Sequence, residues 1–189
     1  MTTTPTAVTY GLFEGQRAVG QLDTFMPAYE EVYAEPPYRE GPGDVALFVT
    51  HYQAHVQRPG MRLALARDGD EVVGFAYGLP LAADAAWWHG VPGLHEDFTR
   101  EDGARTFAVF ELAVRKPWRR SGVAGRLHAL LRDGLAVERV TLAVRPEPEA
   151  KPAQSAYAKW GYREVGPVRP REEGPAYTVM VLDVPQPTG

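Results

Sequence analysis

The sequence predicts a mixed α/β or α+β fold in which helices pack on a sheet. Strand-like and amphipathic helical segments alternate through the second half of the chain. In the first half, two apolar strand-like segments meet at RDGD, residues 67–70, and an Asp-Gly pair at such a junction is typical of a β-hairpin. The 189 residues, 44% of them hydrophobic, are enough for a sizeable core, so we expect a single domain over 1–189.

The first half is expected to hold a strand at 9–13, helices at 19–33 and 44–56, and strands at 62–66 and 71–79. Apolar residues at helical spacing indicate both helices. Pro27 lies inside the first and should kink or split it. Asp44 is the expected N-cap of the second.

The second half is expected to hold a strand at 106–114, a helix at 122–132, a strand at 139–144, a helix at 152–160, and strands at 162–165 and 177–184. Gly134 and Gly161 are the expected ends of the two helices. Residues 80–105 have no clean period and form a long loop insertion, which we expect near the acceptor site. Residues 1–8 and 185–189 are expected to be flexible tails.

Composition excludes several classes of protein. There are no cysteines, which rules out disulfides, thiolate metal sites and a cysteine nucleophile. The net charge of −4 argues against bulk nucleic-acid binding. No secretory signal and no apolar run of about 18 residues is present, so we expect a cytoplasmic protein that binds no membrane. His89 and His95 are read as solvated loop residues, and no metal site is expected.

The segment ELAVRKPWRRSGVAGRLHALL, residues 111–131, passes from a strand through a glycine-bearing turn into an amphipathic helix. Small residues at a helix start let backbone N–H groups approach an anion, and the helix dipole favours negative charge there. Four cations come just before it: Arg115, Lys116, Arg119 and Arg120. The segment therefore predicts a diphosphate receptor, although a solvated basic face and close packing at the helix start remain alternatives. It is neither a P-loop nor a dinucleotide-binding glycine fingerprint.

Arg119, Gly122 and Ala124 match the pyrophosphate-loop pattern of the GCN5-related N-acetyltransferase family, which this segment resembles. The resemblance implies a mostly antiparallel twisted sheet of about six to seven strands with about four helices. It implies acetyl-CoA as the acyl donor. The implied cofactor-binding residues are Leu112, Ala113 and Val114, whose backbone would pair with the pantetheine arm, and Arg119, Arg120, Ser121, Gly122, Val123, Ala124 and Gly125, whose amides would bind the pyrophosphate.

A second match is in AQSAYAKWGYREVG, which is similar to the closing helix of that family. Tyr157 lies four residues before the Gly161-Tyr162 pair. The resemblance gives Tyr157 the role of general acid toward the leaving thiolate, and a core tyrosine is the alternative. The family usually has an asparagine seven residues before this tyrosine, and Ala150 stands there instead, so one polar contact to the cofactor is lost.

Glu111 is the candidate general base, because it is the only charged residue in the strand TFAVFELAV. Burial in such a strand would raise its pKa toward the working range of a base. A structural glutamate paired with an arginine, a contact to the acceptor, or a reaction that uses water instead are the alternatives. Backbone N–H groups near Leu112–Val114 are the expected donors to the oxyanion.

The acceptor site is expected to be lined by Tyr29, Tyr33, Trp87 and Trp88, with nearby acidic residues attracting a cationic amine. Residues 1–110 carry 15 acidic and 7 basic residues and residues 111–189 carry 9 and 13, which would suit a cationic ligand meeting an anionic one. Uneven solvated charges explain the same counts. Tyr29 and Tyr33 are one helical turn apart, which is also typical of core residues.

These observations predict an acyltransferase that passes the acetyl group of acetyl-CoA to a primary amine, small or peptidyl, by direct transfer in a ternary complex. The first alternative is a non-catalytic acyl-CoA-binding or sensing module on the same fold. The second is an interaction domain whose Trp87-Trp88 loop anchors a protein partner. The same loop is equally consistent with a homodimer contact or a lid over the acceptor.

Overall fold

The structure is a computed structural model that describes residues 7–185, and it divides into two compact units. Unit 1 comprises the described residues up to Leu79 together with Glu111–Gly134. Unit 2 comprises Pro80–Phe110 together with the described residues from Leu135 onward. The predicted tails 1–8 and 185–189 lie outside the described residues except at 7, 8 and 185. The prediction that one domain covers 1–189 stays a prediction.

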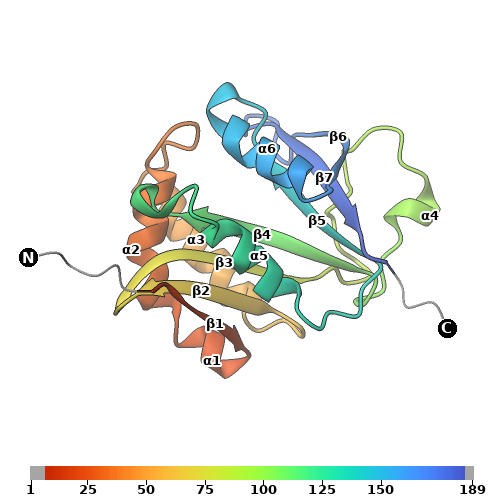
Figure 1. Cartoon of the computed structure of the whole chain (residues 1–189). Helices are drawn as coiled ribbons and strands as arrows, with labels where there is room; N and C mark the ends of the chain where they lie inside the picture. Colours follow the sequence, from red (N-terminus) through yellow and green to blue (C-terminus); the bar gives the residue numbers. More distant parts are fainter. Residues whose placement is uncertain (1–6, 186–189) are drawn as a thin grey trace, which may run out of the picture. The chain divides into compact units, whose positions relative to one another are not determined.

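Unit 1 contains an antiparallel meander of β1 (Thr9–Glu14), β2 (Arg62–Asp68) and β3 (Glu71–Pro80) (Figure 1). Leu12 of β1 pairs with Ala64 of β2, which in turn pairs with Ala76 of β3. Asp68 pairs with Glu71 across the predicted hairpin. Gly69 begins the two-residue loop with a φ of +60°, a conformation that glycine adopts without steric cost.

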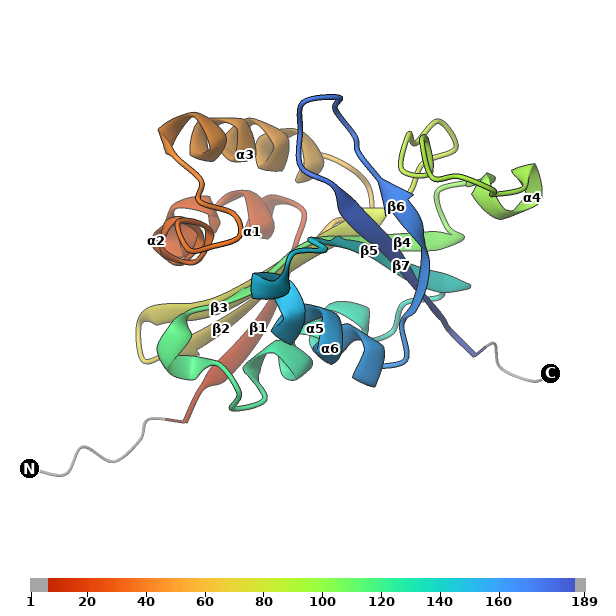
Figure 2. The same cartoon turned by 90° about the horizontal axis from the view of Figure 1, so that it is seen from above.

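Helices cover both faces of this meander: α1 (Gln16–Val19), α2 (Leu22–Tyr33) and α3 (Pro42–His55) come before β2, and α5 (Val123–Arg132) follows β4. Figure 2 shows α2 and α3 on one face and α5 on the other. Phe25 of α2 stacks on Phe75 of β3, with ring centroids 4.8 Å apart. On the opposite face, a Cβ at Gly74 would lie 3.1 Å from Cδ1 of Leu127. Gly74 and Phe75 are adjacent in β3 and therefore face opposite sides of the meander, so that β3 contributes to the packing on both faces.

Unit 2 is built on β5 (Arg139–Val144), β6 (Arg163–Val168), β7 (Tyr177–Asp183) and the first part of β4 (Thr106–Val114), with α4 (Glu96–Thr99) and α6 (Lys151–Lys159). Thr106 of β4 pairs in parallel with Arg139 of β5. The β5–β7 and β6–β7 pairs are antiparallel. The loop between β3 and β4 contributes to the core of this unit, which is made of Leu81, Trp88, Val91, Ala108, Val168, Val179 and Val181.

The seven strands form a mixed sheet in the order β1-β2-β3-β4-β5-β7-β6. Strand β4 contributes Thr106–Phe110 to unit 2 and Glu111–Val114 to unit 1. Among the pairs described here only β4–β5 is parallel. Together with the four longer helices α2, α3, α5 and α6, this confirms the predicted mixed α+β fold.

Two details of the helix prediction were wrong. The segment predicted as one helix over 19–33 is two, since α1 ends at Val19 and α2 begins at Leu22. Pro27 does not split α2, which runs unbroken through it to Tyr33. The proline removes only one hydrogen bond, and the buried face carrying Phe25 and Tyr29 keeps the helix packed.

Asp44 is not an N-cap but lies in the first turn of α3, where its Oδ2 accepts a hydrogen bond from the Gly41 amide at 2.9 Å. The helix begins at Pro42, whose missing N–H has no role in a first turn. In the second half, the short 3₁₀ segment η2 (Pro148–Ala150) leads directly into α6.

Candidate active site

The predicted phosphate loop connects β4 to α5 in unit 1. It consists of the 3₁₀ turn η1 (Lys116–Trp118), the exposed residues 119–122 and the first turn of α5. Arg120 has a φ of +63° and Gly122 a φ of +86°. Gly122 is the N-cap residue of α5, and its left-handed backbone is the conformation that favours glycine. The chain therefore reverses sharply just where the helix starts.

The backbone amides at this turn are available as donors. The first helical hydrogen bond of α5 runs from the Arg126 amide to the Gly122 oxygen at 3.1 Å. Within residues 7–185, no acceptor is found for the amides from Arg120 to Gly125. Residues 119–122 are exposed, whereas Val123 is buried and Ala124 and Gly125 are half-buried. Unbonded amides at the positive end of a helix dipole form a receptor for an anion.

Two of the four cations before α5 already form ion pairs with glutamates in α2, just after α2, and in β3. Arg115 forms ion pairs with Glu31, at 2.5 Å, and with Glu71. Arg119 donates from Nη1 to Glu35 at 2.8 Å and from Nε to the Val114 oxygen at 2.8 Å. These contacts fasten both ends of the turn to α2 and β4.

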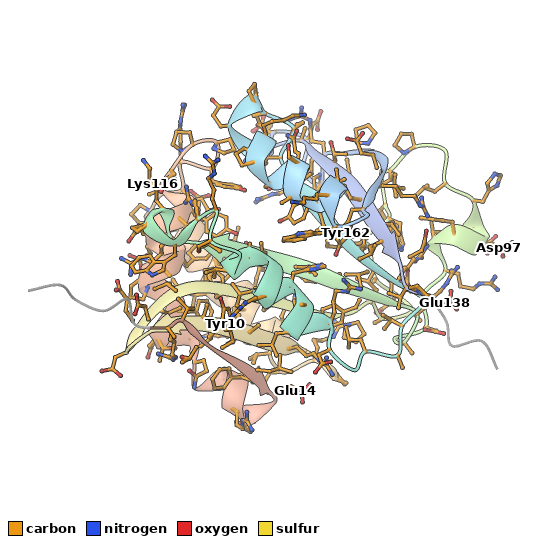
Figure 3. The ribbon with its side chains drawn as sticks, viewed as in Figure 1. Tyr10, Glu14, Asp97, Lys116, Glu138 and Tyr162 are labelled. Carbon is orange, nitrogen blue, oxygen red and sulfur yellow. The ribbon has the colours of Figure 1, made fainter. Side chains whose placement is uncertain are left out.

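The other two cations, Lys116 and Arg120, are exposed and have no ion pair with any residue of the described part of the chain. Figure 3 shows Lys116 at the outer edge of unit 1. Farther along α5, Arg126 lies over the ring of Tyr10 at 5.6 Å. Lys116 and Arg120 are therefore the cations of this loop that are free to meet an incoming anion.

The strand before the loop is held closely against β3. The Arg115 amide donates to the Val73 oxygen at 2.9 Å. A Cβ at Gly74 would lie 3.0 Å from the Ala113 oxygen, so a larger residue there would displace the backbone. Ala113 and Val114 are buried and Leu112 is half-buried. The end of β4 is a fixed point from which the loop begins.

Glu111 is a partly buried carboxyl group that faces three tyrosines and a second glutamate. The Tyr33 hydroxyl donates a hydrogen bond to its Oε2. The pKa of Glu111 is raised to about 8, mainly by burial. The hydrogen bond from Tyr33 acts in the opposite direction, and the charge of Glu40 adds to the increase. The same Glu111 charge contributes to raising the pKa values of Tyr29 and Tyr77, which places these rings around it. No arginine pairs with Glu111 among the described residues, so the structural alternative for this glutamate finds no support.

Tyr29 and Tyr33 belong to one aromatic cluster of unit 1. Their ring centroids are 4.5 Å apart, and Tyr29 also stacks on Phe48 at 3.8 Å. The Tyr29 hydroxyl donates to Glu40 Oε2 at 2.6 Å. Both rings are buried, with 3% and 7% of their surface exposed. They are thus core residues whose hydroxyl groups reach carboxylates.

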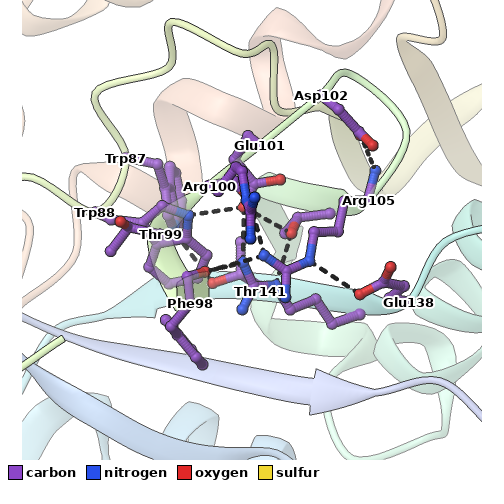
Figure 4. Close-up of polar contacts among 12 residues, drawn as sticks. Trp87, Trp88, Phe98, Thr99, Arg100, Glu101, Asp102, Arg105, Glu138 and Thr141 are labelled. Carbon is purple, nitrogen blue, oxygen red and sulfur yellow. Dashed lines mark hydrogen bonds and ion pairs between the residues drawn. The ribbon is translucent and has the colours of Figure 1, made fainter. Parts of the chain in front are cut away.

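Trp87 and Trp88 lie in unit 2. Trp88 is 3% exposed, and its Nε1 donates to Glu101 Oε1 at 2.8 Å. Trp87 donates from Nε1 to Thr141 Oγ1 at 3.1 Å. Figure 4 shows Trp87, Trp88, Thr141 and Glu101 close together, and Glu101 also forms a buried ion pair with Arg139. The interpretation of the pair as an exposed anchor for a protein partner is wrong for Trp88, because its ring is enclosed in the core.

Tyr157 lies on α6 of unit 2, with its ring 8% exposed and edge-on to Trp160 and Tyr162 at centroid distances of 5.6 and 5.9 Å. Gly161, which follows the helix, has a φ of +95°. Ala150, where the asparagine of the resembled family would stand, is 3% exposed at the end of η2. The Tyr157 ring therefore lies among aromatic neighbours near the end of α6, and its role as general acid stays a prediction.

Sequence reasoning missed the glutamates that complete these sites. Glu31, in the last turn of α2, and Glu35, just beyond its end, are four residues apart, and so are their partners Arg115 and Arg119 along the loop. This matched spacing is consistent with two ion pairs, but the sequence alone does not show that the segment at 31–35 and the loop at 115–119 are neighbours. Nothing in the sequence near Glu40 marks it as a partner of Tyr29.

None of the helices within residues 7–185 combines the length and apolar character that crossing a membrane would require. No cluster of three or more histidine, aspartate or glutamate side chains in this part of the chain is arranged to hold a metal ion.

The strand, the glycine turn and the helix start with its unbonded amides are the features expected of an acyltransferase that holds its donor by a diphosphate. A family model described as "Acetyltransferase (GNAT) family" matches residues 21–162. The chain belongs to the GNAT acetyltransferase family. It is an acetyl-CoA-dependent N-acetyltransferase, with acetyl-CoA as donor and an amine as acceptor.

Solved structures with the same fold cover nearly the whole chain. A GNAT-family acetyltransferase from Desulfovibrio desulfuricans has a TM-score of 0.65 at 12% identity, covering 94% of this chain and 99% of that one. The ribosomal-protein-S18-alanine N-acetyltransferase from Escherichia coli has 0.63 at 17%, covering 96% and 97%. Aminoglycoside 6'-acetyltransferase type Ii has 0.63 at 19%, covering 95% and 99%. A comparison with curated protein sequences gives no match.

Proposed function

We propose that the enzyme transfers acetyl directly from acetyl-CoA to a primary amine while both are bound. The amine nitrogen, once it has lost a proton, bonds to the thioester carbonyl carbon. The tetrahedral intermediate then breaks its C–S bond, the sulfur takes a proton, and the nitrogen loses one as the amide forms. An ammonium ion and acetyl-CoA thus yield an acetamide, coenzyme A and one proton.

The observation that carries this proposal is the row of unbonded amides from Arg120 to Gly125 at the start of α5. Such a row matches the two linked phosphates of coenzyme A in charge and in donor chemistry. In the proposed complex the amides of Arg120, Ser121, Gly122, Val123, Ala124 and Gly125 surround the pyrophosphate, while the Arg119 amide, which was also expected there, already donates to the Lys116 oxygen at 3.2 Å. Lys116 and Arg120 add charge from the solvent side.

The backbone of Leu112, Ala113 and Val114 is the proposed partner of the pantetheine arm. Backbone N–H groups in the same stretch would stabilise the oxyanion, which needs donors but no particular side chain. The proposal is supported by the rigidity of this strand end, fixed by the Arg115–Val73 hydrogen bond and the contact at Gly74. A rigid strand places a thioester reproducibly.

Glu111 is the proposed general base. A carboxyl group with a pKa near 8 is a stronger base than an ordinary glutamate and is still partly ionised at neutral pH. In the transfer it takes a proton from the ammonium group, breaking an N–H bond and forming an O–H bond. Tyr157 is the proposed general acid that protonates the departing sulfur, a role that rests on the family motif.

Tyr29 and Tyr33 are the proposed wall of the acceptor site, since they are the aromatic residues beside Glu111. It stays a prediction that Trp87 and Trp88 bind the acceptor, because the contacts described here are hydrogen bonds within the core of unit 2, to Thr141 and Glu101. The acceptor is proposed to be a cationic amine without a nucleic-acid or membrane partner, and the transfer as written uses no metal ion. A cytoplasmic location and a homodimer through the 80–105 loop also stay predictions.

The test is calorimetric titration of the protein with acetyl-CoA, followed by assay of coenzyme A release with candidate amines. An aminoglycoside and an alanine-initiated peptide are the first acceptors to try, because two enzymes of the same fold are named for such substrates. We expect micromolar acetyl-CoA binding and amine-dependent release that survives EDTA. Binding without release for any amine would favour the acyl-CoA-sensing alternative, and no binding would refute the loop assignment.

A further inference from the structure

The hydroxyl of Tyr33 reaches the Glu111 carboxylate from a ring that is held in place by other contacts. Tyr33 is the last residue of α2 and is 7% exposed. Its ring contacts Tyr29 at 4.5 Å and meets Tyr38 edge-on at 4.8 Å. Tyr29 is itself fixed by the stack on Phe48. Packing therefore sets the position of the Tyr33 ring. The position of its hydroxyl does not depend on the hydrogen bond to Glu111.

The hydrogen bond from Tyr33 engages one oxygen of the Glu111 carboxylate and leaves the other oxygen without this contact. Tyr33 donates to Oε2, and no described residue donates to Oε1. A phenol that has a fixed ring and two side-chain torsions can restrain a carboxylate with little loss of its own entropy. The free oxygen then has a defined direction in which to accept a proton.

We propose that Tyr33 is a positioning residue for Glu111: its hydroxyl holds Oε2 so that Oε1 is aimed to take the proton of the acceptor amine. The inference rests on the proposed function, in which Glu111 is the base. It gives Tyr33 a role distinct from lining the acceptor site. Because the bond is made to the charged form of the carboxyl, it also favours ionisation at neutral pH.

The groups that face Glu111 can be named element by element. Tyr29 and Tyr33 come from α2, Glu40 from the segment after it and Tyr77 from β3. Burial raises the pKa of each of these tyrosines well above its ordinary value, so all three stay protonated where Glu111 titrates.

Behind Tyr77 lies His55 of α3, whose Nδ1 is 3.2 Å from the Tyr77 hydroxyl. Burial lowers the pKa of His55 to about 4, so it is neutral above pH 6. With the tyrosines protonated and His55 neutral, Glu111 is the member of this cluster whose raised pKa lies near neutrality. Tyr33 acts in that range only as a hydrogen-bond donor.

The experiment compares Tyr33→Phe with the wild type in two measurements. The first is a ¹³C-NMR titration of protein labelled at the glutamate side-chain carboxyl carbon, in which Glu111→Gln identifies the Glu111 signal. The second is the pH profile of kcat/KM with acetyl-CoA and whichever of kanamycin and an alanine-initiated peptide the wild type acetylates. Removing one charge-assisted hydrogen bond should raise the Glu111 midpoint by about one pH unit.

We expect kcat/KM of Tyr33→Phe to fall more than about tenfold at pH 7 and to stay below the wild-type value near pH 10, because the lost ionisation is recovered there but the lost positioning of Oε1 is not. The control is Tyr52→Phe, which removes a buried hydroxyl that donates to the Ala18 oxygen at 2.9 Å in the same unit. It should leave both titrations unchanged.

A Tyr33→Phe midpoint equal to the wild type, or full recovery of the wild-type kcat/KM at about pH 10, would overturn the inference. Full activity and an unchanged pH profile in Glu111→Gln would overturn it as well, by removing the base it serves. If neither amine reacts with the wild type, the proposed acceptor chemistry fails separately, and the NMR titration still decides whether Tyr33 controls Glu111.

Discussion

The guanidinium group of Arg119 donates from Nε to the main-chain oxygen of Val114 across 2.8 Å, which ties the phosphate loop back to the strand it leaves. Its Nη1 is paired with Glu35, two residues beyond the end of α2, at 2.8 Å. The arginine of the motif therefore uses its side chain to shape the turn. Anion binding is left to the backbone amides that the turn exposes.

Glu35→Gln should tighten coenzyme A binding. The substitution removes a negative charge beside a site for a diphosphate and releases Nη1 of Arg119, while the bond from Nε to Val114 remains. Both effects act in the same direction. Since this ion pair is partly exposed, we expect the Kd to fall only about two- to fivefold at low salt, and less at high salt.

The matched control is Glu30→Gln, which makes the same charge change on α2 at an exposed residue with no ion pair to the loop among the described contacts. Its Kd, measured by the same titration calorimetry, should stay within a factor of about two. Weaker coenzyme A binding by Glu35→Gln would show instead that the ion pair orders the loop for binding.

Gly122→Trp should abolish detectable coenzyme A binding. A side chain at this N-cap enters open space beside the exposed amides, where the pyrophosphate is proposed to lie. Gly134→Trp is the control, because Gly134 also has a positive φ, +67°, and open space around it, but at the other end of α5. Each variant should lose about 1–2 kcal/mol of stability through backbone strain. Equal coenzyme A affinity in the two would remove the loop from the site.

Tyr157→Phe should lower turnover much more than donor affinity. If the hydroxyl protonates the leaving sulfur, kcat falls about a hundredfold while the Kd for coenzyme A changes less than about twofold. Tyr162→Phe, which alters a neighbouring ring in the same aromatic cluster, should change neither quantity strongly. Steady-state kinetics with the best acceptor and calorimetry supply both numbers. A kcat unchanged in Tyr157→Phe would exclude it from the chemistry.

The elements with strong local signals could be predicted from the sequence, and those that depend on tertiary partners could not. The strand at Thr106–Val114 and the turn at Gly122 follow from apolar pattern and glycine chemistry alone. Pro27 was expected to kink or split a helix, and the split did not occur because of the packing of Phe25 and Tyr29, on which local propensity carries no information. Glu111 could be singled out as a lone charge in an apolar strand, but the Tyr33 hydroxyl that it meets lies 78 residues away.

Glu101→Gln should strongly destabilise the protein, although the residue sits in the segment with the weakest sequence signal. Glu101 Oε1 accepts hydrogen bonds from Trp88, Thr106 and Arg139, each at 2.8 Å. The Glu101 and Arg139 side chains are 1% and 5% exposed. Neutralising one partner leaves a buried, unpaired guanidinium, which costs about 3–5 kcal/mol.

Chemical denaturation measures this loss, with Glu96→Gln on the exposed helix α4 as the control. That substitution should change the free energy of unfolding by less than about 0.5 kcal/mol. A similar small change in Glu101→Gln would mean that the ion pair does not hold the 80–105 loop.

His128 should make the protein sensitive to acid. It lies on α5 with 3% of its surface exposed, and burial, with a contribution from Arg132, lowers its pKa to about 4. The unfolded chain binds this proton near pH 6.5 and the folded protein only near pH 4, so His128 supports stability above pH 6.5 and that support is lost as pH falls toward 4. Between pH 7.5 and 5 the loss amounts to about 2 kcal/mol.

The test compares the free energy of unfolding of His128→Gln with that of the wild type across this range. Glu111 acts with the opposite sign, since its pKa is raised and its support is lost as pH rises from 4.5 through about 8. Its contribution is common to both proteins, so the difference between the two curves isolates His128. We expect the variant to be less stable at pH 7.5 and the gap to narrow by about 2 kcal/mol at pH 5. Parallel curves would mean that His128 takes up its proton equally readily in the folded and unfolded states.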